Sequence, residues 1–100
     1  MFGIVNKIKR EVKDKTIYME IFGDNKVAYR VLSCRLFVYN DEYITYGIEV
    51  IDRKSSQIEY ISDFSRNIED AVAFAELIIA EKCKPKQLYS KALDFLRISI

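Results

Sequence analysis

The 100-residue sequence contains no histidine and no tryptophan, and it has only one proline, three glycines and two cysteines. Because histidine is the commonest general base and zinc ligand, its absence excludes Ser–His and Cys–His catalytic pairs. The three glycines form neither a GxGxxG nor a GxxxxGK loop, so the usual phosphate-binding loops are excluded as well. No apolar run approaches about 18 residues, the length of a membrane-spanning helix. We therefore expect no catalytic residues, no metal, no cofactor and no transmembrane segment.

The two cysteines, Cys34 and Cys83, have no CxxC spacing and offer too few ligands for zinc. We expect two buried thiols in a reducing compartment, while the sequence alone leaves a disulfide between them open. Residues 1–8 have no apolar stretch long enough for a signal peptide and no small-residue cleavage site. The expected location is the cytoplasm.

The composition is that of a folded domain, with 50% apolar and 13% aromatic residues. This length suits one domain, which we expect to span residues 1–100. The formal net charge of +1 argues against a dedicated nucleic-acid binder. The charge is nevertheless uneven, because five basic residues near the N-terminus face only two acidic ones. These candidate anion or nucleic-acid contacts are Lys7, Lys9, Arg10, Lys13 and Lys15.

Period-two patterns rich in β-branched and aromatic residues predict a sheet over about residues 15–62. The expected strands are 16–22, 27–39, 43–51 and 57–62. The short turns between them favour antiparallel neighbours. Residues 1–13 fit either an amphipathic helix or a fifth strand, and the latter half favours a strand. In the second strand the apolar positions change from odd to even numbers, which predicts a β-bulge near Val31–Leu32.

From residue 67 the apolar period changes to 3.6, which predicts a helical hairpin over about residues 67–98. Asn67 is the expected N-cap of the first helix, and Pro85 is expected in the first turn of the second. Strands followed by two helices indicate an α+β fold: an antiparallel sheet of about four strands with both helices packed on one face.

Three short motifs stand in the second half: Tyr46-Gly47-Ile48, Asp63-Phe64-Ser65 and, after Pro85 and Leu88, Asp94-Phe95-Leu96. Over residues 43–96 the chain resembles a family of small bacterial proteins classed as a domain of unknown function. That family more often has Ile where Phe64 stands, and the N-terminal third matches it loosely. The resemblance implies a strand-rich half followed by a helical hairpin, and it brings no activity and no functional residues.

Several polar and special residues have both a structural and a functional interpretation. Asp63 and Asp94 are a candidate carboxylate pair, but organisation of the turn by Asp63 and Ser65 is the favoured interpretation. Gly47 lies inside a strand, where a bulge or a large neighbour is favoured over close approach of a ligand. Sheet aromatics beside arginines raise the option of base stacking. These residues are Tyr18, Tyr29, Tyr43, Tyr60, Arg30, Arg35 and Arg53.

The first helix is apolar nearly all round. At 100° per residue, Phe74 and Leu77 fall outside the stripe expected to face the sheet. Either the second helix or the N-terminal segment covers them, or they form a surface for a protein partner or a homodimer. We expect a small non-enzymatic protein-interaction or regulatory module that is able to self-associate. The alternative is a nucleic-acid-binding accessory protein that uses the basic N-terminal segment and the sheet tyrosines, with binding to an anionic membrane surface as a variant.

Overall fold

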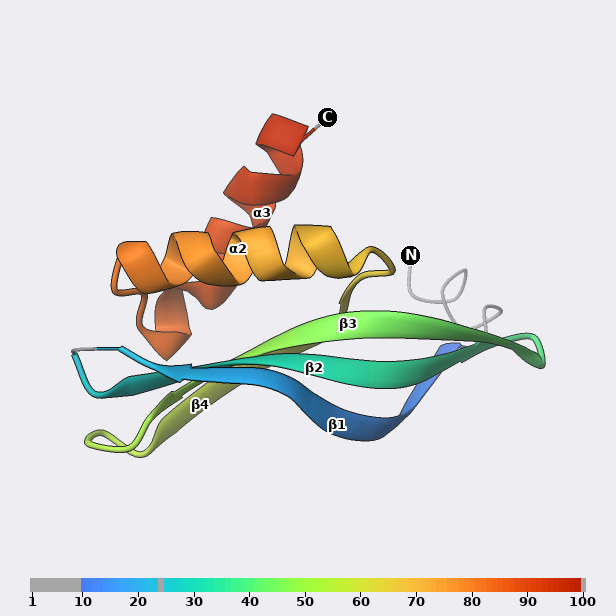
Figure 1. Cartoon of the computed structure of the whole chain (residues 1–100), viewed down its shortest axis with the longest axis horizontal. Helices are drawn as coiled ribbons and strands as arrows, with labels where there is room; N and C mark the ends of the chain where they lie inside the picture. Colours follow the sequence, from blue (N-terminus) through green and yellow to red (C-terminus); the bar gives the residue numbers. More distant parts are fainter. Residues whose placement is uncertain (1–9, 24, 100) are drawn as a thin grey trace, which may run out of the picture.

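The computed structural model describes residues 10–23 and 25–99, which form a four-stranded antiparallel sheet followed by two helices (Figure 1). The strands are β1 (Arg10–Phe22), β2 (Val27–Val38), β3 (Asp41–Asp52) and β4 (Gln57–Ser65), which lie side by side in chain order. The helices are α2 (Ile68–Ala80) and α3 (Leu88–Ser99), and the short 3-10 helix η1 (Pro85–Gln87) leads into α3. The α+β class predicted from the sequence is confirmed.

Several element boundaries differ from those expected. β1 begins at Arg10 and so includes the latter half of the ambiguous N-terminal segment, whose first nine residues lie outside the described part of the chain. β4 continues to Ser65 rather than ending at residue 62. The turn between β2 and β3 is Tyr39–Asn40 rather than residues 40–42, since both residues have positive φ, 51° and 74°. That is the backbone of a two-residue hairpin, in which Asn is common and Tyr is not.

The bulge expected within β2 near Val31–Leu32 is wrong, because β2 pairs with β3 in an unbroken register from Val27 to Val38. The nearest register shift lies in β1, between Ile17 and Met19, directly opposite those two residues. The apolar phase of β2 changes for another reason: its first half is buried on one face of the sheet and its second half on the other. We call these the helix face and the far face.

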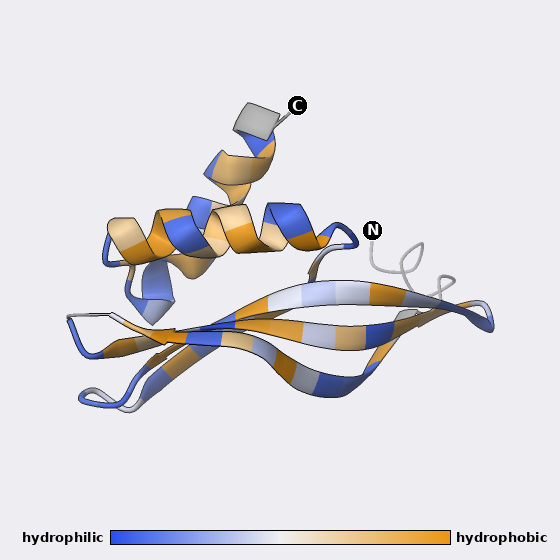
Figure 2. Cartoon of the chain, viewed as in Figure 1, coloured by the Kyte–Doolittle hydropathy of each residue, from blue (hydrophilic) through white to orange (hydrophobic). Residues whose placement is uncertain are grey.

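The main core lies on the helix face, where α2 packs across the middle of the sheet (Figure 1). It joins alternate residues of β2 and β3 to one side of α2, and Leu88 and Ala92 of α3 complete it. Apolar and hydrophilic bands alternate along both helices in Figure 2, as expected for helices with one buried side. Asn67 caps α2 by accepting a hydrogen bond from the Glu69 N–H, and Pro85 opens η1, both as predicted.

A second, smaller core lies on the far face. Its residues Leu32, Cys34 and Leu36 are at most 6% exposed, although neither α2 nor α3 lies on this face. The sheet edges curl toward one another on this face, and Figure 1 shows β1 bending away from the helices. As a result Lys15 Nζ of β1 lies 4.4 Å from the ring centre of Tyr60 on β4, across the two intervening strands. β2 is therefore buried on both faces.

Candidate functional site

The structure separates the two candidate interface residues of α2. Phe74 is fully buried, with its ring stacked on Phe64 at 4.7 Å and packed against Phe95 of α3 at 5.3 Å between ring centres. Phe74 is therefore part of the core, and the second helix covers it. Leu77 is 38% exposed on the outer side of α2. A partner surface containing both residues does not exist in this structure.

The basic residues of the N-terminal segment do not form a patch within the described part of the chain. Lys7 and Lys9 lie outside it, and Arg10 pairs with Val38 at the start of β1. Lys13 lies 5.9 Å from the ring centre of Phe37, whereas Lys15 lies over Tyr60 on the far face. The bulge at Asp14, where φ is 54°, separates the two lysines along β1.

The described residues place the candidate acid–base and nucleophilic groups apart. Asp63 accepts a hydrogen bond from the buried Thr45 hydroxyl, whereas Asp94 is exposed on α3 beside Arg97. Ser65 accepts a hydrogen bond from the Asn67 N–H, which fixes the entry into α2. Within residues 10–23 and 25–99, no three His, Cys, Asp or Glu side chains gather as metal ligands would. The hydrogen bonds of Asp63 and Ser65 therefore organise the end of β4.

Both cysteines are buried and unpaired, as the sequence predicts. Cys34 belongs to the far-face core and Cys83 to the helix-face core. Burial raises the pKa of both thiols, which disfavours the reactive thiolate.

At Gly47 the backbone of β4 lies so close to β3 that there is no room for a side chain. A Cβ atom there would lie 2.6 Å from the Ile61 carbonyl oxygen and 3.0 Å from the Ser62 Cα. The register between β3 and β4 shifts at this point, between Tyr46 and Ile48. The bulge interpretation of Gly47 is confirmed, and the close neighbour is the protein's own chain.

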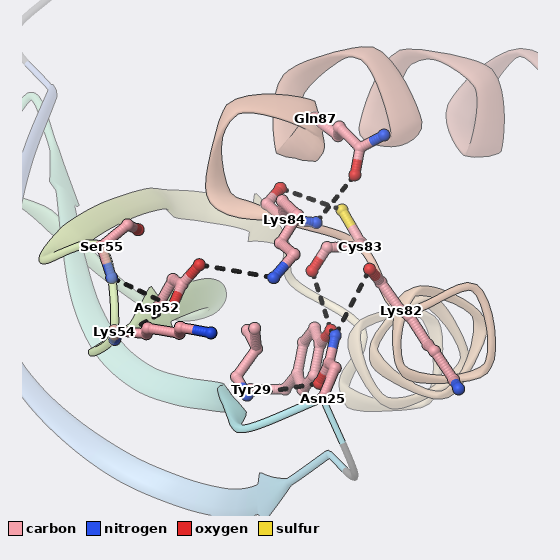
Figure 3. A network of polar contacts seen from close by, with 10 residues as sticks. Asn25, Tyr29, Asp52, Lys54, Ser55, Lys82, Cys83, Lys84 and Gln87 are labelled. Atoms are coloured by element: carbon pink, nitrogen blue, oxygen red, sulfur yellow. Dashed lines mark hydrogen bonds and ion pairs between the residues drawn. The ribbon is translucent and has the colours of Figure 1, made fainter.

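A polar network ties the segment between α2 and α3 to the end of the sheet (Figure 3). The buried Tyr29 hydroxyl donates to the Cys83 carbonyl oxygen at 2.8 Å and accepts from the Asn25 amide at 3.2 Å. Lys84 Nζ lies 3.5 Å from the Asp52 carboxylate, whose pKa is lowered because hydrogen bonds from Ser55 and Lys54, with the Lys84 charge, outweigh its desolvation. A buried tyrosine needs a partner for its hydroxyl. The network is therefore a structural anchor.

The far face carries three cation–aromatic pairs: Lys15 on Tyr60, Arg66 on Tyr43 and Arg53 on Phe22. Of the other tyrosines singled out, Tyr29 is buried and Tyr18 lies on the helix face against Tyr46. Arg30 is held between Glu20 and Glu49, and Arg35 pairs with Asp14 and Glu42. The far face is thus rich in cation–aromatic contacts, and Glu20 and Glu49 add negative charge beside Arg30 there.

An apolar groove lies between β4 and α3, and we call it the β4–α3 groove. Ile61, Asp63 and Phe64 form one wall, and Tyr89, Ala92, Leu93 and Leu96 form the other. Its volume is about 200 Å³. Leu93 at its rim is 61% exposed, the largest fraction of any large apolar residue in the described part of the chain. This groove is able to accept a large apolar side chain.

Two polar side chains, Asp63 and Tyr89, belong to the lining of the β4–α3 groove. The Tyr89 hydroxyl donates to the Tyr60 carbonyl oxygen at 2.9 Å, which satisfies one backbone group at the outer edge of β4. Desolvation and the nearby Glu59 carboxylate raise the pKa of Tyr89. In the last turn of α3, Arg97 is 79% exposed. The lining is thus mostly apolar, with the Glu59 carboxylate beside Tyr89 and the Arg97 guanidinium beyond Leu96.

Sequence reasoning missed the β4–α3 groove, although a signal for it was present. The second helix carries two adjacent apolar stripes: Leu88, Ala92 and Phe95 pack inward, whereas Tyr89, Leu93 and Leu96 recur at the same spacing one residue later and stay exposed. A stripe beyond the one that the core needs is typical of an interface.

No family model, curated protein or solved structure matches this chain. The family resemblance over residues 43–96 therefore stays a prediction. Among the described residues, no helix combines the length and apolarity needed to span a bilayer.

Proposed function

We propose that this protein is a non-enzymatic binding module that recognises an apolar segment of a protein at the β4–α3 groove. The observation that carries the proposal is the exposed stripe of Tyr89, Leu93 and Leu96 beside a groove of about 200 Å³. Exposed apolar surface costs solubility, so a contiguous patch next to a cavity usually marks an interaction site.

The remainder of the described surface supports binding rather than chemistry. The buried thiols have raised pKa values, and the two carboxylates that the sequence singled out serve separate local contacts. The lining of the groove offers one carboxylate and one phenol, and the phenol already donates to β4. Such a site can orient and desolvate an apolar side chain, which is the usual basis of peptide recognition by a groove.

A tagged pull-down from lysate of the source cells tests the proposal. The full-length chain should capture a stoichiometric protein, and Leu93→Glu should lose it because the new carboxylate would be buried in an apolar contact. Leu93 is mostly exposed, so this variant should keep the circular dichroism spectrum and melting temperature of the wild type. Leu77→Glu is the matched comparison, since it changes an exposed leucine on the other helix.

The two leucine variants distinguish the two surfaces. Capture that survives Leu93→Glu but is lost in Leu77→Glu would move the interface to the outer side of α2 and overturn the groove proposal. Capture of the same protein by both variants would also contradict it.

A second candidate function is binding of single-stranded nucleic acid on the far face. The specific observation in its favour is the set of three cation–aromatic pairs, because aromatic rings beside basic groups stack bases and contact phosphates. It ranks second because Glu20 and Glu49 flank Arg30 on the same face.

Fluorescence anisotropy with a labelled single-stranded oligonucleotide tests this second candidate. Tyr60→Ala should weaken binding by roughly tenfold or more, and affinity should fall steeply with salt. Tyr18→Ala is the control, because Tyr18 is also exposed (59%, against 44% for Tyr60) but lies on the helix face. No binding at low salt, or equal loss in both variants, would count against the far face.

A further inference from the structure

We infer that the occupant of the β4–α3 groove is a second copy of this chain, so that two molecules form a two-fold symmetric dimer with their α3 helices antiparallel. This inference rests on the proposed function and names the partner. A two-fold interface must be self-complementary, because the same patch serves on both molecules. The patch therefore has to carry both the protruding group and the cavity that receives it.

Both parts are present on one surface. Leu93 protrudes, with 61% of its surface exposed, and the groove beside it is floored by the small, buried Ala92. In Figure 1 the C-terminal part of α3 rises beyond α2, so its outer side remains accessible. A leucine that faces an alanine is the large-against-small packing by which two helices interlock.

The antiparallel register follows from the spacing along α3. If the two-fold axis passes between residues 92 and 93, Leu93 of each molecule lies opposite Ala92 of the other. The same axis places Leu96 against Tyr89 at both ends. Every exposed member of the stripe then has a partner of complementary size, since each bulky leucine meets either the small alanine or the flat side of a ring.

The charges fit the same register. Glu59 lies beside Tyr89 at one end of the groove, and it has no basic partner among the described residues. Arg97 lies at the opposite end of α3, 79% exposed, with only Asp94 at 4.0 Å. Antiparallel helices bring Arg97 of one molecule to the Tyr89 end of the other, where Glu59 lies. A parallel arrangement would instead bring the two Arg97 side chains together, so the charges select the antiparallel one.

Sedimentation equilibrium of the purified full chain, over about 1–500 µM, tests the dimer. The wild type should dimerise, and Leu93→Glu should weaken the dimer by more than about a hundredfold, because it would place a carboxylate in each groove. Glu59→Arg and Arg97→Glu should each weaken it by roughly tenfold, since each substitution alters two symmetry-related pairs. The double variant Glu59→Arg/Arg97→Glu should restore the wild-type constant.

Glu76→Arg is the control for the charge reversals, because Glu76 is exposed on α2 outside the groove and its reversal should leave the dimer unchanged. A wild type that is monomeric throughout the range would overturn the second copy as occupant, and so would charge reversals without mutual rescue. The proposed function fails separately: if the wild type is monomeric but Leu93→Glu still loses a captured protein, the groove binds a different chain. If Leu93→Glu changes neither assay, both are wrong.

Discussion

At the scale of single residues, Gly47 shows how one missing side chain shapes the far face. Its hydrogen stands where a methyl group would meet the backbone of Ile61 and Ser62. This close approach carries the end of β4 across β3, so that Asp63 reaches the Thr45 hydroxyl. Without it, the far-face core would lose its cover on this side.

We therefore expect Gly47→Ala to destabilise the protein by about 1–3 kcal/mol, because the atoms in the way are backbone and cannot rotate aside. Urea denaturation followed by circular dichroism measures the change. Gln57→Ala, at an exposed position of the same hairpin, should stay within about 0.5 kcal/mol of the wild type. Equal stability of the Gly47→Ala variant would show that the approach of β4 is not tight in solution.

At the scale of elements, α2 is turned further toward α3 than its sequence indicates. Its buried residues are Ala71, Phe74, Ala75 and Ile78. Val72 and Ile79, which a period of 3.6 residues also places on the apolar stripe of this helix, remain partly exposed. The helix divides its apolar surface between the sheet and α3, so the centre of its buried side lies between these two neighbours.

This orientation predicts very different costs for two apolar positions of α2. Phe74→Ala should lower the free energy of unfolding by about 3–5 kcal/mol, because it empties a cluster of three rings. Leu77→Ala should cost less than about 1 kcal/mol, since Leu77 is already 38% exposed. Chemical denaturation of both variants under one set of conditions provides the comparison. Similar costs would mean that α3 does not cover Phe74.

The elements that were predictable are those set by local pattern, and the unpredictable features are those set by a distant neighbour. Alternation and turn residues indicated the sheet, and Asn67 and Pro85 marked the helix starts. The bulge was misplaced because two different structures give the same change of apolar phase in the sequence of β2. One is a bulge within the strand, and the other is burial of its first half on one face and its second half on the other. The groove was missed because it needs the position of α3 relative to β4, which no local pattern contains.

At the scale of the whole molecule, the two cysteines lie in the cores on opposite faces of the sheet. Cys34 lies in the far-face core and Cys83 in the helix-face core, and β2 contributes to both. Because the cores share this strand, neither should open without the other. The protein should therefore unfold as one cooperative unit.

Thiol labelling of the two single-cysteine variants tests this cooperativity. Both thiols should react at rates that give one opening free energy, equal to that from denaturation. Burial raises the pKa of both thiols, so they ionise at a lower pH in the unfolded chain than in the folded protein. The folded protein should therefore lose stability as the pH rises past about 9. Labelling of Cys34 that is faster by a hundredfold would show that the far-face core opens separately.

The burial of β2 on both faces also bears on how the chain finds its pairing during folding. A slip of one residue turns every side chain of a strand to the opposite face. In a sheet with one buried face, such an error exposes one row of apolar side chains and affects the core on that face alone. Here it would remove Tyr29 and Val31 from beneath α2, and at the same time withdraw Cys34 and Leu36 from the far-face core. A register shifted by one residue is therefore strongly disfavoured, because it would remove apolar side chains from the cores on both faces of the sheet.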